Sequence, residues 1–196
     1  YASVFGTEAA FVRHSILSGT HALTIGLFGL LRPGDTMLAV TGKPYDTLDS
    51  VIGISGKSGE GSLHDFGINY RQIDLLQTEF PDESPAYMHK ASDIIDFDSI
   101  KSALASDRNI KVIFIQRSKG YLDRPTLTVS QINEIISFVR DLSEAFVVVD
   151  NCYGEFTELS EPKADLLIGS LIKNPGGGIA ESGGYLAGSR KAIELC

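Results

Sequence analysis

Cysteine is scarce in this sequence, and long apolar runs are missing. Cys152 and Cys196 are its only cysteines. A disulfide framework is therefore not expected, and the composition fits a reducing, cytoplasmic setting. The longest apolar runs, such as residues 145–149, are far too short to span a bilayer. The chain also lacks a signal-peptide pattern and an initiator methionine, which predicts that it is a piece of a longer protein.

Positive charge is sparse as well. Lysine and arginine number 17 against 25 acidic residues, so the net charge is −8. Binding to a nucleic acid needs clustered basic side chains, and none occurs here. The four histidines, at positions 14, 21, 64 and 89, show no metal-ligand spacing, and no HExxH or CxxC motif is present. We therefore expect no nucleic-acid partner, no membrane partner and no metal.

What the chain does contain is a regular alternation of short apolar runs and helical patterns. This alternation predicts an α/β fold with three layers, in which a mostly parallel sheet carries helices on both faces. Residues 54–65 are rich in glycine and serine and predict a loop, whereas 76–92 has no clear pattern. Without repeats or linkers, the chain reads as one domain. Strands are predicted at 36–40, 68–73, 110–115, 146–149, 165–168 and 185–187, and helices at 18–31, 46–52, 98–106 and 128–142.

Chemistry is expected beyond the carboxyl ends of the strands, where open α/β sheets bind ligands. The first candidate is the sequence Ser18-Gly19-Thr20-His21, which opens a predicted helix. Its small residues leave backbone N–H groups accessible, and the start of a helix favours an anion. Taken alone, the motif fits a plain helix cap better.

Two further candidates follow later strands. Asp150 comes directly after the buried run 147–149, where a carboxylate can pair with the protonated ring nitrogen of pyridoxal phosphate (PLP). An aspartate that only caps a turn is the alternative. Lys173 lies between an apolar stretch and the glycines 176–178, so partial burial should lower its pKa and free the amine for Schiff-base chemistry. A surface lysine before a turn is the competing interpretation.

The order of these three features resembles that of fold-type I PLP enzymes, and several longer strings make the resemblance closer. The chain resembles the aluminium-resistance-protein family, which is described as cystathionine β-lyase-like or methionine γ-lyase-like, over nearly its whole length. The strings that carry the likeness are SGTHAL, LRPGD, TGKPYDTL, IQRSKGY, VDNCYGEF and GSLIKNPGGGIAESGGY.

The resemblance implies a PLP-dependent carbon–sulfur lyase that acts on a sulfur-containing amino acid by β- or γ-elimination. It also implies a homodimer or a tetramer of dimers. Residues 1–196 would form the PLP-binding large domain. An N-terminal segment and a smaller C-terminal domain, which carries the arginine for the substrate carboxylate, would lie outside this chain.

Site residues carry over one by one. Lys173 matches the Schiff-base lysine and Asp150 matches the partner of the pyridine nitrogen. Gly19 and Thr20, with Ser18 before them, match the phosphate-binding turn. The family's lyases place a threonine directly before the lysine, and this chain has isoleucine at position 172.

Three further positions follow from the same resemblance. Ser170 matches a hydroxyl that binds the cofactor phosphate. Tyr45 is similar to a tyrosine whose ring stacks on the cofactor, and a half-buried core tyrosine is its alternative. Gln116 or Ser118 ends a strand and is a candidate contact for the phenolic oxygen.

Other interpretations remain open from the residues alone. A different fold-type I enzyme, such as an aminotransferase, or a non-catalytic PLP-binding fragment fits the same pattern.

The sequence Gly56-Lys57-Ser58 lacks the preceding glycine of a phosphate-binding P-loop and predicts a surface loop. Cys152 is expected to be a structural thiol. Glu155 and Glu158 are expected on the surface or in a subunit interface.

Overall fold

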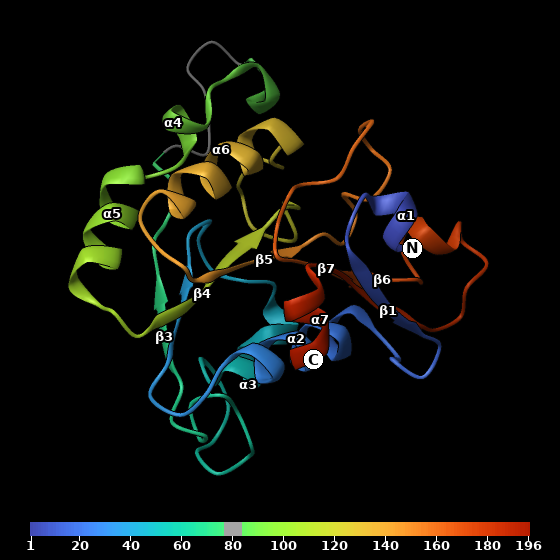
Figure 1. Cartoon of the computed structure of the whole chain (residues 1–196), viewed down its shortest axis with the longest axis horizontal. Coiled ribbons are helices and arrows are strands. Elements are labelled where there is room, and N and C mark those ends of the chain that lie inside the picture. The colour runs from blue at the N-terminus through green and yellow to red at the C-terminus, as the bar shows by residue number, and fades with distance from the viewer. Residues whose placement is uncertain (77–83) are drawn as a thin grey trace.

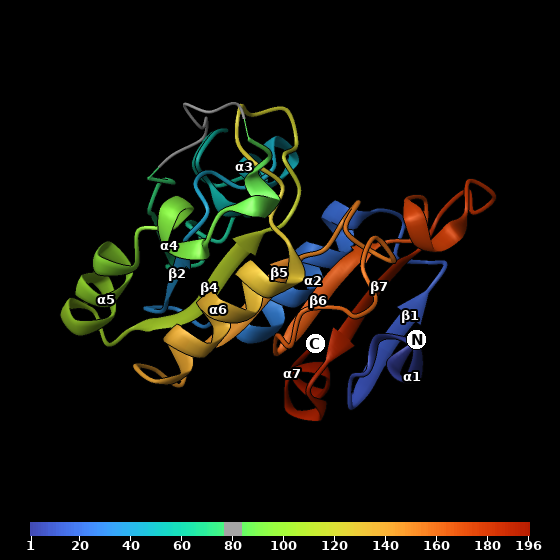
Figure 2. The same cartoon turned by 90° about the horizontal axis from the view of Figure 1, so that it is seen from above.

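A seven-stranded sheet forms the centre of the molecule, with the strand order β1-β7-β6-β5-β4-β2-β3. The computed structural model describes residues 1–76 and 84–196. Seen from above, the sheet runs from β2 and β4 at one end to β1 at the other (Figure 2). The strands are β1 (Ala9–Arg13), β2 (Thr36–Ala39), β3 (Asn69–Gln72), β4 (Ile110–Gln116), β5 (Phe146–Asp150), β6 (Leu166–Ser170) and β7 (Gly184–Gly188).

The sheet is mostly parallel, as predicted. Of the described strands, β1, β2, β3, β4, β5 and β6 run in one direction. Strand β7 runs in the opposite direction and pairs antiparallel with both of its neighbours, β6 and β1. The register of the central pair places Gln116, the last residue of β4, beside Asp150, the last residue of β5. Two side chains that are distant in sequence therefore meet at the carboxyl edge of the sheet.

Helices cover both faces of this sheet and complete the three predicted layers. Helices α2, α3 and α7 lie on one face, whereas α4, α5 and α6 lie on the other (Figure 1). The α-helices are α1 (Ala2–Phe5), α2 (Gly19–Leu30), α3 (Asp49–Ile52), α4 (Ala91–Ile94), α5 (Phe97–Ser106), α6 (Val129–Arg140) and α7 (Arg190–Leu195). The 3-10 turns are η1 (Asp46–Leu48), η2 (Ala86–Met88) and η3 (Asn174–Gly176).

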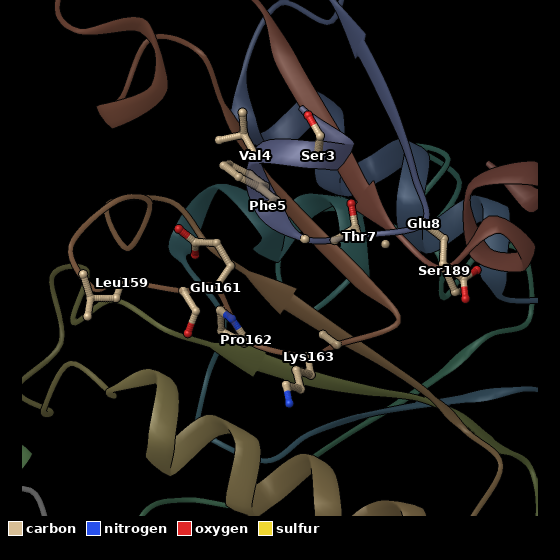
Figure 3. A pocket seen from close by; sticks show the side chains of 14 residues that line it. Ser3, Val4, Phe5, Thr7, Glu8, Leu159, Glu161, Pro162, Lys163 and Ser189 are labelled. Carbon is tan, nitrogen blue, oxygen red and sulfur yellow. The ribbon is translucent and has the colours of Figure 1, made fainter.

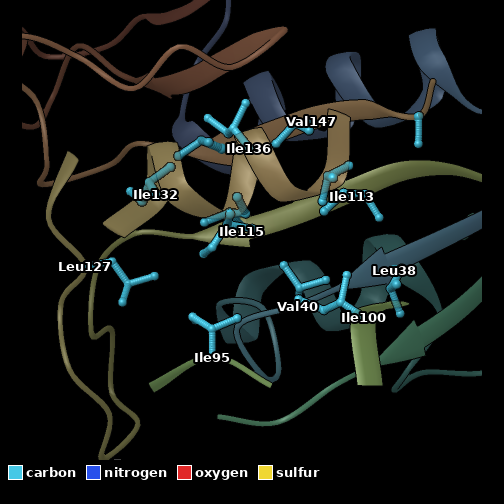
Figure 4. Packing of buried hydrophobic residues seen from close by; sticks show 14 of the residues in the cluster. Leu38, Val40, Ile95, Ile100, Ile113, Ile115, Leu127, Ile132, Ile136 and Val147 are labelled. Atoms are coloured by element: carbon cyan, nitrogen blue, oxygen red, sulfur yellow. The ribbon is translucent and has the colours of Figure 1, made fainter. Parts of the chain in front are cut away.

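Alternation along the central strands divides the core into two clusters. Ile113 and Ile115 of β4 point toward α6 and pack with its Ile132 and Ile136 (Figure 4). The intervening residues pack on the opposite face, so that Phe114 belongs to the cluster that contains the buried side of α2. A strand buried on both faces needs apolar residues at every position. The apolar run of residues 112–115 in β4 therefore reflects the central place of this strand in the sheet.

Local capping fixes where the two longest helices begin. The Thr128 side chain accepts a hydrogen bond from the Gln131 N–H at 3.2 Å, and the Gln131 side-chain oxygen accepts one from the Thr128 N–H at 2.9 Å. These two bonds form a capping box at the start of α6. At the start of α2, the Ser18 hydroxyl accepts a hydrogen bond from the His21 N–H at 3.2 Å.

Some elements differ from the prediction. Helix α1, strand β1 and helix α7 were not predicted, because each is short and β1 is a half-buried edge strand without strict alternation. The predicted helix 46–52 is a 3-10 turn followed by one α-helical turn. Of the segment without a clear pattern, 76–92, residues 77–83 lie outside the described residues, and the remainder contains η2 and α4. None of the described helices has the length and apolar character needed to cross a membrane.

Candidate active site

A cavity of about 220 Å³ lies where the carboxyl ends of β4 and β5 meet the start of α2. It brings together every predicted site residue except Ser170. Its lining consists of Ser18, Gly19, Thr20, Leu23, Tyr45, Thr47, Gln116, Ser118, Asp150, Cys152, Tyr153, Ile172 and Lys173.

The start of α2 supplies backbone donors to this cavity. Within the described part of the chain, the N–H groups of Gly19 and Thr20 make no hydrogen bond. A Cβ at Gly19 would lie 3.0 Å from the Cys152 sulfur, so a larger residue would narrow the space in front of these donors. The Thr20 and Thr47 hydroxyls lie 2.6 Å apart and add polar groups to the same wall. Free N–H groups at a helix start suit an anion such as a phosphate.

Asp150 forms the buried acidic end of the cavity. Only 3% of the residue is exposed, and its Oδ1 accepts a hydrogen bond from the Cys152 N–H at 3.1 Å. Burial raises the pKa of this carboxyl group, and hydrogen bonds from Cys152 and Gln116 act against that rise. No lysine, arginine or histidine nitrogen of the described residues lies within ion-pair distance of it. A buried carboxylate that lacks a cation and faces a cavity fits the role of partner to a protonated ring nitrogen.

Gln116 and Tyr45 form another part of the cavity lining. The Gln116 side chain accepts a hydrogen bond from the Tyr45 N–H at 3.1 Å and donates one to the Ser118 hydroxyl at 3.1 Å. The amide of Gln116 is therefore committed to holding the Tyr45 turn. The Tyr45 ring lies 5.5 Å from that of Tyr121, and a hydrogen bond with Tyr121 is the main reason that its pKa rises to about 12.

Lys173 reaches the cavity from the loop that connects β6 to β7. Its Nζ donates a hydrogen bond to the Tyr153 hydroxyl at 2.5 Å and lies 4.4 Å from the centre of the Tyr153 ring. The hydrogen bond with Tyr153 raises the pKa of Lys173, and it outweighs the opposing effect of burial. The prediction that burial would lower the pKa of this lysine was therefore wrong, because Tyr153 stabilises the charged amine.

Tyr153 is a site residue that the sequence analysis missed. It adopts a left-handed backbone with φ of 68° and is 54% exposed. The signal that could have found it is its place three residues after Asp150, within the string VDNCYGEF. Cys152, between them, lines the cavity, and burial raises the pKa of its thiol, so it carries its proton at neutral pH.

Ser170 lies behind the cavity wall. It is fully buried, and its hydroxyl donates a hydrogen bond to the Gly183 carbonyl at 3.3 Å. The same hydroxyl accepts one from the Ile172 N–H at 3.3 Å. A further hydrogen bond, of 2.9 Å, joins the Leu171 N–H to the Gly183 carbonyl. These bonds close the base of the loop of residues 171–183, which we call the Lys173 loop. We call this closed base the neck. A phosphate contact from Ser170 remains a prediction.

The loop after β5 corrects one expectation about acidic residues. Glu155 was expected on the surface or in an interface, but it is only 1% exposed. Its Oε1 accepts a hydrogen bond from the buried Tyr185 hydroxyl at 2.8 Å, and burial raises its pKa to about 7. The reason is that the loop after β5 packs against β7, where the Tyr185 hydroxyl binds Glu155. Arg117 binds other side chains of the same loop, among them Glu158, which lies 2.9 Å from the guanidinium.

A second cavity, of about 460 Å³, lies between the segment of residues 3–8 and that of residues 159–164 (Figure 3). It contains none of the predicted site residues. Its carboxylate Glu161 is already bound by Arg117 at 3.0 Å. In the described part of the chain, no group of three histidine, cysteine, aspartate or glutamate residues could hold a metal ion.

The mostly parallel sheet with helices on both faces gives the chain the fold of the fold-type I PLP-dependent proteins. The chain is similar to the apo form of CalE6, a methionine gamma lyase from Micromonospora echinospora, with a TM-score of 0.65 over 98% of the chain. The identity is 23%, so this likeness concerns the fold alone.

The chain belongs to the methionine gamma-lyase family, whose model matches residues 1–196. It is 48% identical to a protein from Listeria monocytogenes whose name links it to cystathionine beta-lyase and aluminum resistance, with a TM-score of 0.87. It is 46% identical to a carbon-sulfur lyase involved in aluminum resistance from Clostridium novyi, with a TM-score of 0.86. Both likenesses cover the whole chain.

The chain spans less than half the length of these relatives. It covers 45% of the Listeria protein and 44% of the Clostridium protein. A curated relative, the uncharacterized protein YnbB of Bacillus subtilis, is 51% identical over 200 residues, and the match covers 44% of its length. What the whole protein does is therefore taken up as a proposal.

Proposed function

We propose that this chain is the PLP-binding part of a carbon–sulfur lyase that acts on a sulfur-containing amino acid by β- or γ-elimination. The observation that carries the proposal is the convergence, in one cavity, of free N–H groups at the start of α2, the buried Asp150 and the Lys173 amine. The names of the Listeria and Clostridium relatives support the lyase chemistry.

The residues present fit PLP at both ends of the cavity. Gly19 and Thr20 would hold the phosphate with their N–H groups, and Asp150 would pair with the ring nitrogen. Lys173 would hold the aldehyde carbon through Nζ. When bound, PLP supplies an electron sink for negative charge that develops on the amino acid.

The chain's own groups then control protons. The Asp150 carboxylate would favour a proton on the ring nitrogen, because it is buried and forms no ion pair with another cation of the described residues. The Lys173 amine is positioned to remove a proton from the substrate once its Nζ is neutral, and the Tyr153 hydroxyl is its hydrogen-bond partner. A homodimer or a tetramer of dimers, and a C-terminal domain that binds the substrate carboxylate, complete this proposal.

The first experiment tests cofactor attachment in the full-length protein. After incubation with PLP and reduction with borohydride, we expect a stable adduct on the peptide that contains Lys173. Lys173→Ala should abolish this adduct, whereas Lys101→Ala, which changes an exposed lysine of α5, should leave it intact. An adduct that persists in Lys173→Ala, or its absence from the wild type, contradicts the proposal.

A second measurement tests the reaction. With cystathionine or methionine as substrate, elimination releases a keto acid, ammonia and a thiol in equal amounts. Transfer of the amino group to an added keto acid, without release of a thiol, would instead indicate an aminotransferase. Binding of PLP without any turnover would leave a non-catalytic PLP-binding protein.

A further inference from the structure

Arg117 is the largest fully buried side chain in the described residues, and its contacts converge on one loop. It follows Gln116 at the end of β4 and is 1% exposed. Its Nη1 donates to Asn151 Oδ1 at 2.8 Å and to Glu161 Oε2 at 3.0 Å. Its Nη2 donates to Thr157 Oγ1 at 3.2 Å and to Glu158 Oε1 at 2.9 Å. All four partners belong to residues 151–161, which we call the Arg117 loop.

The Arg117 loop is packed directly on the guanidinium. A Cβ at Gly154 would lie 2.5 Å from Arg117 Nε, so only glycine allows this approach. Two other residues of the loop, Tyr153 and Phe156, have positive φ values of 68° and 62°. A non-glycine residue in this conformation costs about 1–3 kcal/mol and persists only when its surroundings enforce it. The buried arginine joins both ends of the loop, because it binds Asn151 and Glu161, which are also joined directly by a 2.9 Å hydrogen bond from Asn151 Nδ2 to Glu161 Oε2.

Tyr153 connects this loop to the cavity. It precedes Gly154, the residue in closest contact with Arg117, and its carbonyl accepts a hydrogen bond from Asn174 at 3.1 Å. Its hydroxyl accepts the hydrogen bond from Lys173 Nζ. Arg117 itself does not line the cavity. Its effect on Lys173 must therefore pass through the loop.

We propose that Arg117 is a positioning residue, whose guanidinium holds the Arg117 loop in the conformation that lets the Tyr153 hydroxyl reach Lys173 Nζ. This inference concerns the protein's own residues in the absence of PLP and does not depend on the proposed function. The titratable groups that act on Lys173 are Tyr153 and Cys152 from the loop after β5 and Tyr121 from the segment after β4, and Asp150 lines the same cavity.

The test measures the protonation of Lys173 in the full-length protein after hydroxylamine and dialysis have removed any carbonyl cofactor. Competitive amine labelling across pH 7 to 11, followed by mass spectrometry, gives the titration of Lys173, with Lys101 as an internal reference. Tyr153→Phe removes the stabilising hydroxyl and should lower the pKa of Lys173. At pH values below the midpoint of the Lys173 titration, labelling of Lys173 in Tyr153→Phe should then be about threefold or more above that in the wild type.

Arg117→Lys keeps a cation but loses the fork that binds four side chains. We expect a shift in the same direction as in Tyr153→Phe. In the double variant we expect no further shift beyond that of Tyr153→Phe alone, because Arg117 acts through Tyr153. Arg140→Lys is the matched control: Arg140 pairs with Asp165 at 2.6 Å, outside the Arg117 loop, and should leave the Lys173 titration unchanged.

Glu158→Ala is a milder variant for the case that Arg117→Lys fails to fold. It removes one partner of Nη2 from a half-exposed position and should shift the titration in the same direction. A folded Arg117→Lys or Glu158→Ala protein whose Lys173 titrates as in the wild type overturns the inference. An Arg117→Lys shift that adds fully to that of Tyr153→Phe also overturns it. Failure of PLP binding would leave these results unaffected, so the two proposals are tested separately.

Discussion

The Lys173 amine is subject to two opposing effects in this site. Burial disfavours its charge, and the Tyr153 hydroxyl stabilises it more strongly. Asp150 and Glu155, by contrast, are buried without a cation beside them, and burial dominates the pKa of both. The pKa values of these three groups are thus shifted for different physical reasons, and each group can be tested alone.

Asp150→Asn removes the negative charge that would face the cofactor ring and keeps the size of the side chain. We expect PLP affinity to fall at least about tenfold, since a hydrogen bond to a charged group contributes about 1.5–3 kcal/mol. Titration of the visible absorbance with PLP measures this change. Asp141→Asn, at the exposed end of α6, is the control. Equal affinities for wild type and Asp150→Asn would remove Asp150 from the site.

Glu155→Gln tests the buried carboxyl group through the pH dependence of stability. The pKa of Glu155 is raised from 4.5 to about 7, so the folded state holds a proton that the unfolded state releases. The free energy of unfolding should fall as pH rises from about 4.5 to about 7, by up to about 3 kcal/mol from this group. Urea unfolding at pH 5 and pH 8 measures the fall. Glutamine, which does not titrate, should reduce it, and an unchanged fall would contradict the assignment.

Helix α6 illustrates stability that resides in one element. Its capping box satisfies backbone donors at the helix start that would otherwise lack partners. Thr128→Ala should lower the free energy of unfolding by about 1 kcal/mol. The exposed Ser137→Ala in the middle of the same helix should have little effect. Thermal or urea unfolding of the two variants compares them, and equal stabilities would show that the cap contributes nothing.

The same element shows which parts of the fold the sequence could predict. The start of α6 depends on two residues three positions apart, and its core face repeats at helical spacing, so a local pattern was sufficient. Strand β1 has no such pattern because it is a half-buried edge strand, and its pairing with β7 joins residues from opposite ends of the chain. Short helices such as α1 depend on tertiary contacts and carry too little periodic signal to be recognised.

The meeting of Asp150 and Lys173 in one cavity could be predicted from the residue types and from their nearness to strand ends, whereas their roles toward PLP stay predictions. The site was not predictable where a role depends on a contact between distant segments. The pairing of Arg117 with the Arg117 loop bridges many residues along the chain, and the hydrogen bond from Lys173 to Tyr153 depends on the backbone of a single residue. Neither leaves a local pattern in the sequence.

Across the whole molecule, hydrogen bonding is unevenly shared by the strands. Strands β4 and β5 are paired on both sides, whereas β3 pairs only with β2 at one edge and is largely exposed. We expect backbone amides of β5 to exchange with deuterium far more slowly than those of β3. Hydrogen-exchange mass spectrometry measures this, with the two strands of one protein as each other's control. Equal protection of β3 and β5 would contradict the described sheet order.

The neck at the base of the Lys173 loop has a consequence for protein engineering. Because Leu171 and Gly183 close the loop at its base, the length of its tip is separated from the position of the lysine. The tip glycines Gly177 and Gly178 have open space around them. Doubling the length of a flexible loop costs only about 0.6 kcal/mol in closure entropy. The turn after Gly178 is therefore a place where a foreign peptide or a new recognition segment can be inserted close to the Lys173 amine without moving it.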